Sequence, residues 1–539
     1  MDARMMKLPL TIASIIRHAE RWHGATEVVS RHVEGDIHRE TYADVASRAR
    51  RLARALGRLG VQPGDRVGTI AWNGHRHLEI YYATSCSLAI CHTLNPRLFP
   101  EQIAWIAQDA ADRVVFFDLT FLKLVESLAP KLPAVLHWVA MTDRAHMPQS
   151  SLPLLCFEEL VAAEEDRYEW PDCDEDRASS LCYTSGTTGN PKGALYSHRS
   201  TVLHAMAECF PDVFGLSATE TVLPVVPMFH VNAWGIPYAA PMAGTKLVFP
   251  GAGLDGASLC ELFEGEKVTM SAGVPTVWQG LLQYLETSGK RVEHLKRLVI
   301  GGSAAPPAMI RDFREKHGIE VLHAWGMTEM SPLGTLNQFK VKHADWTEAA
   351  RDALREKQGR PHFGVDLEIV GGDGRPLPHD GTAFGDLVVR GHWIIDRYYR
   401  DAGGDVLRDG WFPTGDVATI DADGYMKITD RSKDVIKSGG EWISSIDIEN
   451  LAMAHPAIAE AAVIGVPHPK WAERPILVAV KKAGAEVTKE AMLDFLRPRI
   501  AKFWVPDDVV FVESLPHTAT GKLSKLELRK QFANYKPAS

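Results

Sequence analysis

A loop rich in glycine and hydroxyl residues, 184–193, has the composition of a phosphate-binding segment. It reads Thr-Ser-Gly-Thr-Thr-Gly-Asn-Pro-Lys-Gly. Glycines leave backbone N–H groups open, the hydroxyls add donors and Lys192 adds a positive charge, so such a loop can surround phosphate oxygens. A Walker loop needs Gly-Lys followed by Ser or Thr, and residues 191–193 read Pro-Lys-Gly instead, which disfavours a kinase or GTPase. The alternative to a phosphate site is a flexible surface turn.

A second group of small and polar residues occurs where two predicted strands end. Residues 298–300 form a short apolar strand that leads into Gly-Gly-Ser at 301–303, and Pro307 can open the helix that follows. The next strand, from residue 321, leads into Ala-Trp-Gly-Met-Thr-Glu at 324–329. If this unit is parallel, both loops emerge at one edge of the sheet, where open α/β sheets place their ligands.

These loops need a layered scaffold, and the rest of the sequence predicts one. Helix and strand signals alternate through the first four-fifths of the chain, as in the amphipathic segment 42–59 and the apolar segment 66–72. Residues 430–440 are rich in charge and glycine, which suits a linker, and shorter strand and helix signals follow. We therefore expect a large layered α/β domain over residues 1–432 and a small, separate α+β domain over residues 433–539.

The composition is that of an ordinary globular protein. The 539 residues are 45% hydrophobic and 24% charged with a net charge of −9, which excludes a disordered chain and argues against a nucleic-acid groove. The seven cysteines include no CxxC pair, so we expect neither a cysteine zinc site nor a disulfide framework. The apolar run 8–16 is too short to span a bilayer. We expect a reduced, cytoplasmic protein without a membrane span.

The motifs of one known family follow one another in order along the chain. Segment 184–193 resembles the phosphate-binding signature of the AMP-forming acyl-CoA synthetases, members of the adenylating superfamily that includes luciferases and peptide-synthetase adenylation domains. Six further segments resemble motifs of this family: 227–232, 325–329, 385–391, 410–416, 430–434 and 516–525. The resemblance implies the adenylating-enzyme fold, with a carboxylic acid, ATP, Mg²⁺ and coenzyme A as ligands.

The resemblance also implies roles in adenylation, the step that joins the acid to AMP and releases pyrophosphate. Lys522, carried by the small domain, would stabilise the negative charge that develops on the α-phosphate; composition alone would make it a surface lysine. Glu329 and the Thr184 hydroxyl would bind Mg²⁺, since both offer hard oxygen donors. Thr328 would hydrogen-bond the α-phosphate.

Further residues are expected at the nucleotide. Trp325 would offer a flat face to adenine, although many relatives carry tyrosine at this point. Asp416 would accept hydrogen bonds from both ribose hydroxyls, because an ionised carboxylate can accept several. Its alternative role is to cap a turn. Arg431 would contact the ribose or the phosphate beside Asp416. The other residues expected here are Ser185, Gly186, Thr187, Thr188, Lys192, Gly302, Ser303, Ala304, His323, Ala324 and Gly326.

The second half-reaction requires the thiol of coenzyme A to reach the adenylate. In the family, the small domain rotates about a hinge at the position matched by Lys433 and withdraws the adenylation lysine. The segment then presented to the pantetheine arm would consist of Ser438, Gly439, Gly440, Glu441 and Trp442. Its two glycines would let the backbone approach the thiol closely.

The acyl site is expected around four residues. His230 would position the substrate rather than act as a base, and Trp234 resembles the gate tryptophan of fatty-acid members, its alternative being a core aromatic. Gly302 and Pro332 complete the set. Segment 440–447 resembles the medium-chain fatty-acid CoA ligase branch, and within it the chain is similar to ligases for 3-methylmercaptopropionate that act in dimethylsulfoniopropionate demethylation. Because a pocket separates substrates that differ by one methylene by only ~1–3 kcal/mol, short and medium fatty acids should also react.

Three other functions stay open as alternatives. A peptide-synthetase adenylation module would need a carrier-protein domain, which we do not expect after residue 539. A luciferase-like oxidase would consume oxygen after adenylation. A catalytically inactive relative is disfavoured because Lys522, Glu329 and Asp416 are all present. As partners we expect only the acid, ATP and coenzyme A, with no nucleic acid, and a homodimer as in many relatives.

Overall fold

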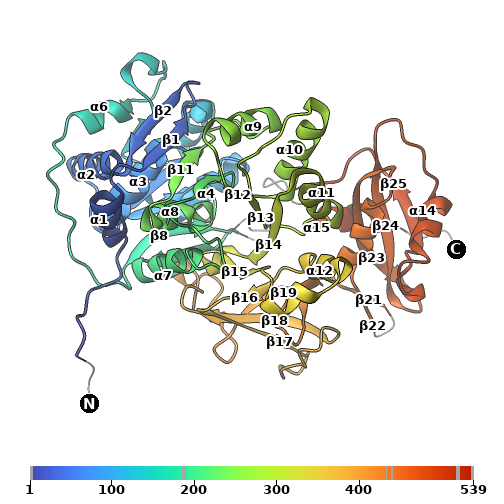
Figure 1. Cartoon of the computed structure of the whole chain (residues 1–539). Helices are drawn as coiled ribbons and strands as arrows, with labels where there is room; N and C mark the ends of the chain where they lie inside the picture. Colours follow the sequence, from blue (N-terminus) through green and yellow to red (C-terminus); the bar gives the residue numbers. More distant parts are fainter. Residues whose placement is uncertain are drawn as a thin grey trace.

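Two large sheets form the body of the molecule (Figure 1). The structure is a computed structural model that describes residues 4–184, 190–432, 434–438, 441–517, 523–533 and 535. The first sheet contains, in spatial order, β7 (Leu154–Cys156), β6 (His137–Ala140), β5 (Asp112–Phe117), β3 (Arg66–Ile70), β4 (Ile90–Thr93), β8 (Ala178–Tyr183) and β9 (Gly193–Ser197). All its pairs are parallel except β8 with β9.

Helices and short 3₁₀ turns connect the strands of this seven-stranded sheet. They are α3 (His75–Cys86), α4 (Pro100–Ala110), η1 (Leu119–Phe121), α5 (Leu122–Leu128), η2 (Ala129–Lys131), η3 (Arg144–His146) and α6 (Phe157–Ala162). Parallel neighbours need such crossover connections, so the alternation of strand and helix signals in the sequence reflects this topology directly.

The second sheet has nine strands and a parallel centre. Its spatial order is β16 (Arg360–Pro361), β15 (Leu333–Leu336), β14 (Glu320–Gly326), β13 (Arg297–Ile300), β12 (Met270–Gly273), β10 (Thr221–Pro224), β11 (Lys246–Phe249), β1 (Glu27–Arg31) and β2 (Ile37–Thr41). The pairs from β14 to β1 are parallel, and the edge pairs are antiparallel. The predicted unit 298–329 is therefore parallel, with Gly318 ending its helix at φ +69°.

The helices around this sheet follow sequence signals closely. They are α1 (Ile12–His23), α2 (Tyr42–Arg58), α7 (His198–Glu208), α8 (Ile236–Ala243), α9 (Gly256–Gly265), α10 (Pro275–Ser288), α11 (Pro307–His317) and α12 (Glu348–Arg355), with η4 (Val231–Gly235), η5 (Thr328–Met330) and η6 (Val341–Asp345). Helix α2 shows why: Thr41 and Asp44 form a capping box at its start, and the predicted apolar face is buried.

One hydrophobic core joins the two large sheets. It contains Val67 and Val114 of the seven-stranded sheet, Val222 and Leu247 of the nine-stranded sheet, and residues of α1, α2, α3 and α8. The predicted layered α/β architecture is confirmed. None of the helices in the described ranges combines the length and apolar character that crossing a membrane demands.

Two smaller sheets complete the fold. An antiparallel sheet contains β17 (Val365–Val370), β18 (Phe384–Gly391), β19 (Phe412–Ile420) and β20 (Met426–Arg431), with η7 (Tyr399–Asp401) between its second and third strands. A C-terminal sheet contains β22 (Glu441–Ile443), β21 (Ile436–Ser438), β24 (Ala472–Lys481), β23 (Ile458–His468) and β25 (Asp508–Phe511). Its helices are α13 (Ser445–Met453), α14 (Lys489–Leu496) and α15 (Lys525–Gln531), and η8 (Lys502–Trp504) precedes β25.

The C-terminal sheet and its helices form the expected small α+β unit, at the end of the molecule away from α1 and α2 (Figure 1). Ser444 and Thr488 cap α13 and α14 with their side chains. The unit rests on β20, where the Ser445 hydroxyl donates to Asp430 over 2.6 Å. The boundary predicted at residue 433 stays a prediction, and Lys433 itself lies outside the described residues.

Candidate active site

The carboxyl ends of β13 and β14 bring the two predicted loops to one edge of the nine-stranded sheet. Gly302 has φ +81°, in the left-handed region that favours glycine. A Cβ on Gly301 would lie 2.9 Å from the Trp234 ring, so this indole packs directly on the loop backbone. A Cβ on Gly326 would lie 2.0 Å from the Pro332 carbonyl oxygen, so only glycine fits there. The edge thus collects the predicted loop glycines together with Trp234 and Pro332.

Trp325, Asp416 and Arg431 form a connected group beside this edge. The Trp325 indole N–H donates to Asp416 Oδ2 over 2.9 Å. Arg431 Nε lies 2.8 Å from Asp416 Oδ1, and the two residues face each other across β19 and β20. Asp416 is buried, whereas half of the Arg431 side chain is exposed. The residue predicted to face adenine and the residue predicted to bind ribose are therefore held together by a hydrogen bond.

Glu329 meets a residue that the sequence analysis did not identify. The Tyr398 hydroxyl donates to Glu329 Oε1 over 2.6 Å, and the Lys192 ammonium lies 4.8 Å from the centre of the Tyr398 ring. Burial raises the pKa of Glu329, while the Tyr398 hydrogen bond and the charges of Arg431 and Lys192 act to lower it. The only sequence signal for Tyr398 is an aromatic pair ahead of a glycine-rich stretch.

The described ends of the glycine-rich loop are joined by two hydrogen bonds. The Thr184 amide donates to the Lys192 carbonyl over 2.9 Å, and the Lys192 amide donates to the Thr184 hydroxyl over 3.1 Å. These bonds continue the ladder between β8 and β9, which ends at the pair Tyr183 and Gly193. The sheet therefore fixes both ends of the segment.

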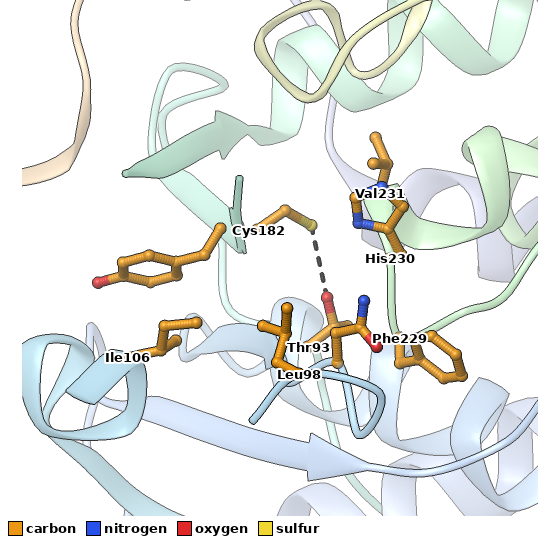
Figure 2. Close-up of a pocket in the computed structure, with 9 residues that line it drawn as sticks. Thr93, Leu98, Ile106, Cys182, Phe229, His230 and Val231 are labelled. Carbon is orange, nitrogen blue, oxygen red and sulfur yellow. Dashed lines mark hydrogen bonds between the residues drawn. The ribbon is translucent and has the colours of Figure 1, made fainter. Parts of the chain in front are cut away.

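His230 lines a small pocket beside β4 and β8 of the seven-stranded sheet (Figure 2). The other lining residues are Thr93, Asn95, Leu98, Ile106, Cys182, Tyr183, Phe229 and Val231. Asn73, which the sequence analysis missed, fixes the approach to His230: its side chain donates to the carbonyls of Pro224 and Val226 over 2.8 and 2.9 Å and accepts from the Met228 amide over 2.7 Å.

The η4 turn after His230 is left-handed. Val231, Asn232, Ala233 and Trp234 have φ between +47° and +57°. Each non-glycine residue in this region costs roughly 1–2 kcal/mol. Asn232 offsets part of this cost, since its side chain donates to the Ser180 hydroxyl over 3.0 Å. The turn directs the Trp234 indole onto the Gly301 backbone.

Two family models match the sequence. The AMP-binding enzyme model covers residues 15–399, and the AMP-binding enzyme C-terminal domain model covers residues 447–522. The chain belongs to the AMP-binding enzyme family. The resemblance identified from the motifs is thereby confirmed.

Relatives of this AMP-binding enzyme match it over its whole length. The 3-methylmercaptopropionyl-CoA ligase of Ruegeria lacuscaerulensis is 55% identical over 533 residues, 99% of each chain. The medium-chain-fatty-acid–CoA ligase of Ectopseudomonas oleovorans is 51% identical over 535 residues, 99% of this chain and 98% of the relative. Among solved structures, ATP-bound MatB from Rhodopseudomonas palustris is 26% identical with a TM-score of 0.83, over 98% of this chain and 100% of MatB.

Several expected site residues of this AMP-binding enzyme hold its loops in place. His323 is buried on β14 and accepts a hydrogen bond from the Ala305 amide over 3.3 Å, while burial lowers its pKa to about 4. Through this hydrogen bond the neutral imidazole connects β14, which also carries Ala324, to the loop that contains Ser303 and Ala304. Tyr196, another residue that the sequence analysis missed, donates its hydroxyl to the carbonyl of buried Thr328.

The remaining expected residues of the AMP-binding enzyme fall in or near the small unit. Buried Ser438 ends β21 and accepts a hydrogen bond from Arg474 over 3.3 Å. Glu441 and Trp442 lie on β22. Eight expected residues lie outside the described ranges: Ser185, Gly186, Thr187, Thr188, Lys433, Gly439, Gly440 and Lys522.

Proposed function

We propose that this AMP-binding enzyme is an ATP-dependent acid–thiol ligase. A carboxylate oxygen of the acid attacks the α-phosphorus of ATP and pyrophosphate leaves; the thiolate of coenzyme A then attacks the acyl carbon and AMP leaves. The observation that carries the proposal is the Trp325–Asp416–Arg431 group, which adjoins the loops at the edge of β13 and β14. The CoA-ligase names of relatives that are 55% and 51% identical to this chain support it.

Asp416 is the residue that we assign to the ribose, and Trp325 and Arg431 already orient its carboxylate. A carboxylate can accept several hydrogen bonds at once. We assign the ribose hydroxyls to the Asp416 carboxylate and the adenine ring to the face of Trp325. The Trp325 hydrogen bond fixes the plane of that face before the nucleotide arrives, so less ordering is needed on binding.

The phosphates would lie between the glycine-rich loop and Glu329. Lys192 and Arg431 bring positive charge toward Glu329, as their effect on its pKa indicates. The Glu329 carboxylate and the Thr184 hydroxyl fit Mg²⁺, which prefers oxygen ligands; bound there, the ion would offset phosphate charge. Lys522 is assigned to the α-phosphate on its motif.

We propose a short or medium-chain acid as substrate, with 3-(methylthio)propanoate, the acid of dimethylsulfoniopropionate demethylation, preferred. The carboxylate would lie near His230 and Gly302, and the acyl chain near Trp234 and Pro332. The name of the Ruegeria relative supports the thioether acid. The name of the Ectopseudomonas relative favours a general medium-chain ligase as the second candidate.

Transfer to coenzyme A would follow rotation of the small unit about Lys433. The pantetheine arm would then meet residues 438–442, where the end of β21 pairs with the start of β22 through Ser438 and Glu441. The seven free cysteines support a reducing, cytoplasmic setting. The expected homodimer stays a prediction, which light scattering in solution checks.

The test is AMP and acyl-CoA formation from ATP, Mg²⁺ and coenzyme A across a panel of acids. The panel contains 3-methylmercaptopropionate, propionate, butyrate, hexanoate, octanoate and benzoate. A preference in kcat/KM for the thioether acid supports the first candidate, and a maximum at hexanoate or octanoate supports the second. Absence of AMP with every acid contradicts the proposed function, and AMP without acyl-CoA would indicate another acceptor.

Asp416→Asn tests the ribose assignment in the same assay. The variant keeps the shape of the side chain but loses its charge, so kcat/KM for ATP should fall about 100-fold. Asp366→Asn is the matched control, because Asp366 pairs with Arg390 across β17 and β18 of the same sheet, 3.0 Å apart but exposed. Equal kinetics of the two variants would remove Asp416 from the nucleotide site.

A further inference from the structure

Three histidines meet outside the candidate active site, although one of them, His75, lies only two residues after Asn73. His32 follows β1, His38 lies on β2 and His75 is the first residue of α3. Their ring centres are 5.1 Å (His32–His38), 4.9 Å (His32–His75) and 3.9 Å (His38–His75) apart. One ring nitrogen of each lies within 4.8 Å of one nitrogen of each of the others. The cluster joins the edge hairpin of the nine-stranded sheet to the helix that follows β3 of the seven-stranded sheet.

All three rings have a buried nitrogen that lacks a hydrogen bond. In the described part of the chain, the Nε2 atoms of His32, His38 and His75 are buried without a hydrogen-bond partner. The other nitrogen of His32, Nδ1, lies 3.0 Å from Asp36 Oδ1. Such a carboxylate fixes the tautomer and leaves Nε2 with a free lone pair, as it does for histidines that bind metals. Buried polar atoms are usually hydrogen-bonded to the protein, to water or to a bound ion, so three such nitrogens in one cluster are candidates for a shared ligand.

The surroundings of the three rings supply carboxylates. Glu40 Oε2 lies 3.5 Å from His38 Nε2, and Glu79 Oε1 lies 4.0 Å from His75 Nε2. Both oxygens of Glu40 and Oε2 of Glu79 have no hydrogen-bond partner among the described residues. Burial raises the pKa of both carboxyls to about 8. A cation at the cluster would favour their ionised forms and give the unpartnered oxygens a ligand.

Two arginines lie close to the cluster, and both form ion pairs with carboxylates. Arg48 lies 2.9 Å from both Glu79 and Glu158. Arg76 lies 2.9 Å from Glu34 and 2.8 Å from Glu158. With Glu40, four carboxyl groups surround two guanidinium groups, so the local balance of charge can accept a cation.

We propose that His32, His38 and His75 bind a divalent transition-metal ion, with zinc as the preferred ion and a Glu40 or Glu79 oxygen as the fourth ligand. Imidazole nitrogen suits zinc and related ions, whereas Mg²⁺ prefers oxygen alone. Burial lowers the pKa of all three histidines, so their rings are neutral and can each donate a lone pair.

The proposed ion is structural and independent of catalysis. Tetrahedral zinc at ~2.0–2.1 Å from nitrogen places its ligand atoms about 3.4 Å apart, so the rings must close by roughly an ångström. His38, on the edge strand β2, has 30% of its side chain exposed and gives the ion access from solvent. Once bound, the ion would link the β1–β2 hairpin to α3 and so join the two large sheets.

The experiment measures zinc bound to the full-length chain, prepared without a histidine tag. The chain is stripped with a chelator and titrated with Zn²⁺ by calorimetry, and metal content is determined after dialysis. One tightly bound equivalent is expected for the unchanged protein, and His38→Gln should weaken that binding roughly 100-fold or more. Co²⁺ in place of zinc should give visible absorption that His38→Gln lacks.

The matched control is His146→Gln. His146 also lies against an aspartate, with Nδ1 2.8 Å from Asp143 Oδ1, but it is exposed and outside the cluster. Zinc should raise the apparent Tm of the unchanged protein and of His146→Gln but not of His38→Gln. His32→Gln serves if His38→Gln fails to fold. The proposal is overturned if the unchanged protein binds no zinc tightly, or if all variants bind zinc with equal affinity. In either case the three imidazoles form a stack without a metal ion.

Discussion

At the residue scale, the candidate site depends on a carboxylate whose charge state its neighbours control. Burial raises the pKa of Glu329, and the hydrogen bond from Tyr398 is the largest influence that lowers it, ahead of the charges of Arg431 and Lys192. A hydrogen bond to the charged form favours that form. Tyr398 therefore helps to keep Glu329 ionised, which is the state required of a metal ligand.

Tyr398→Phe should weaken the enzyme in a pH-dependent way. Loss of the hydrogen bond raises the pKa of Glu329 further, so activity that needs the ionised carboxylate is lost at a higher pH as the solution is acidified. Hydrogen bonds to charged groups contribute about 1.5–3 kcal/mol, so kcat/KM should fall ~10- to 100-fold and the Mg²⁺ requirement should rise. A pH–rate profile and a Mg²⁺ titration measure both effects.

Tyr399→Phe is the control, since it removes the hydroxyl of the next residue, at the start of η7, and leaves the Tyr398 hydrogen bond to Glu329 in place. If both tyrosine variants shift the acid limb equally, or neither does, Tyr398 does not act through Glu329.

At the element scale, the left-handed η4 turn is a tightly constrained connection at the site. It ends at Gly235, with φ +88°, where a Cβ would lie 2.6 Å from His204 Nδ1 and 2.8 Å from Glu208 Oε1. Both groups are buried on α7, so neither can move into solvent. The turn and α7 therefore fit together only through a glycine, and that fit determines where Trp234 lies.

Gly235→Ala should destabilise the fold and disturb the acyl site together. The positive φ alone costs about 1–2 kcal/mol, and the close contacts add to it. The apparent Tm should fall by several degrees and KM for the acid should rise, as calorimetry and steady-state kinetics measure.

Gly265→Ala provides the comparison, because nothing lies within 4 Å of a Cβ at Gly265 and its φ is not positive. A Gly235→Ala protein as stable as Gly265→Ala would show that the turn relaxes without cost.

At the scale of the whole molecule, contacts across the predicted hinge hold the small unit on β20. Asp430 accepts from the Ser445 amide and hydroxyl over 2.9 and 2.6 Å, and Lys427 lies 2.9 Å from Asp447. These pairs lie on opposite sides of residue 433. A rotation there would have to break them, so they favour the orientation seen in this structure.

Lys522→Ala tests whether the two half-reactions separate as the proposed rotation requires. Acyl-adenylate formation should fall at least ~100-fold, because a preorganised donor aimed at developing charge contributes that much. Acyl-CoA formation from supplied acyl-AMP should be largely kept. Lys530→Ala, on α15 and mostly exposed, controls for loss of a nearby positive charge. Equal loss of both half-reactions would contradict the role assigned to Lys522.

The sequence alone determined the layered α/β architecture, the small α+β unit, the strand–helix–strand unit 298–329 and the family, whereas the parallel pairing within that unit came from the structure. The features predicted from the sequence follow from local information: apolar periodicity and motifs that occur in order along the chain. The sequence also indicated Glu329, Trp325 and Asp416 as site residues, although their roles stay predictions.

Only the tertiary structure decided which side chains meet. Trp325 and Asp416 are 91 positions apart, and Glu329 and Tyr398 are 69 apart. The cysteine pattern speaks against a zinc site, whereas the structure brings together His32, His38 and His75 from the β1–β2 hairpin and the start of α3. Spacing along the chain describes one helix or strand at a time. Contacts between elements depend on strand register and on which faces are buried, and these are fixed only when the sheets pack together.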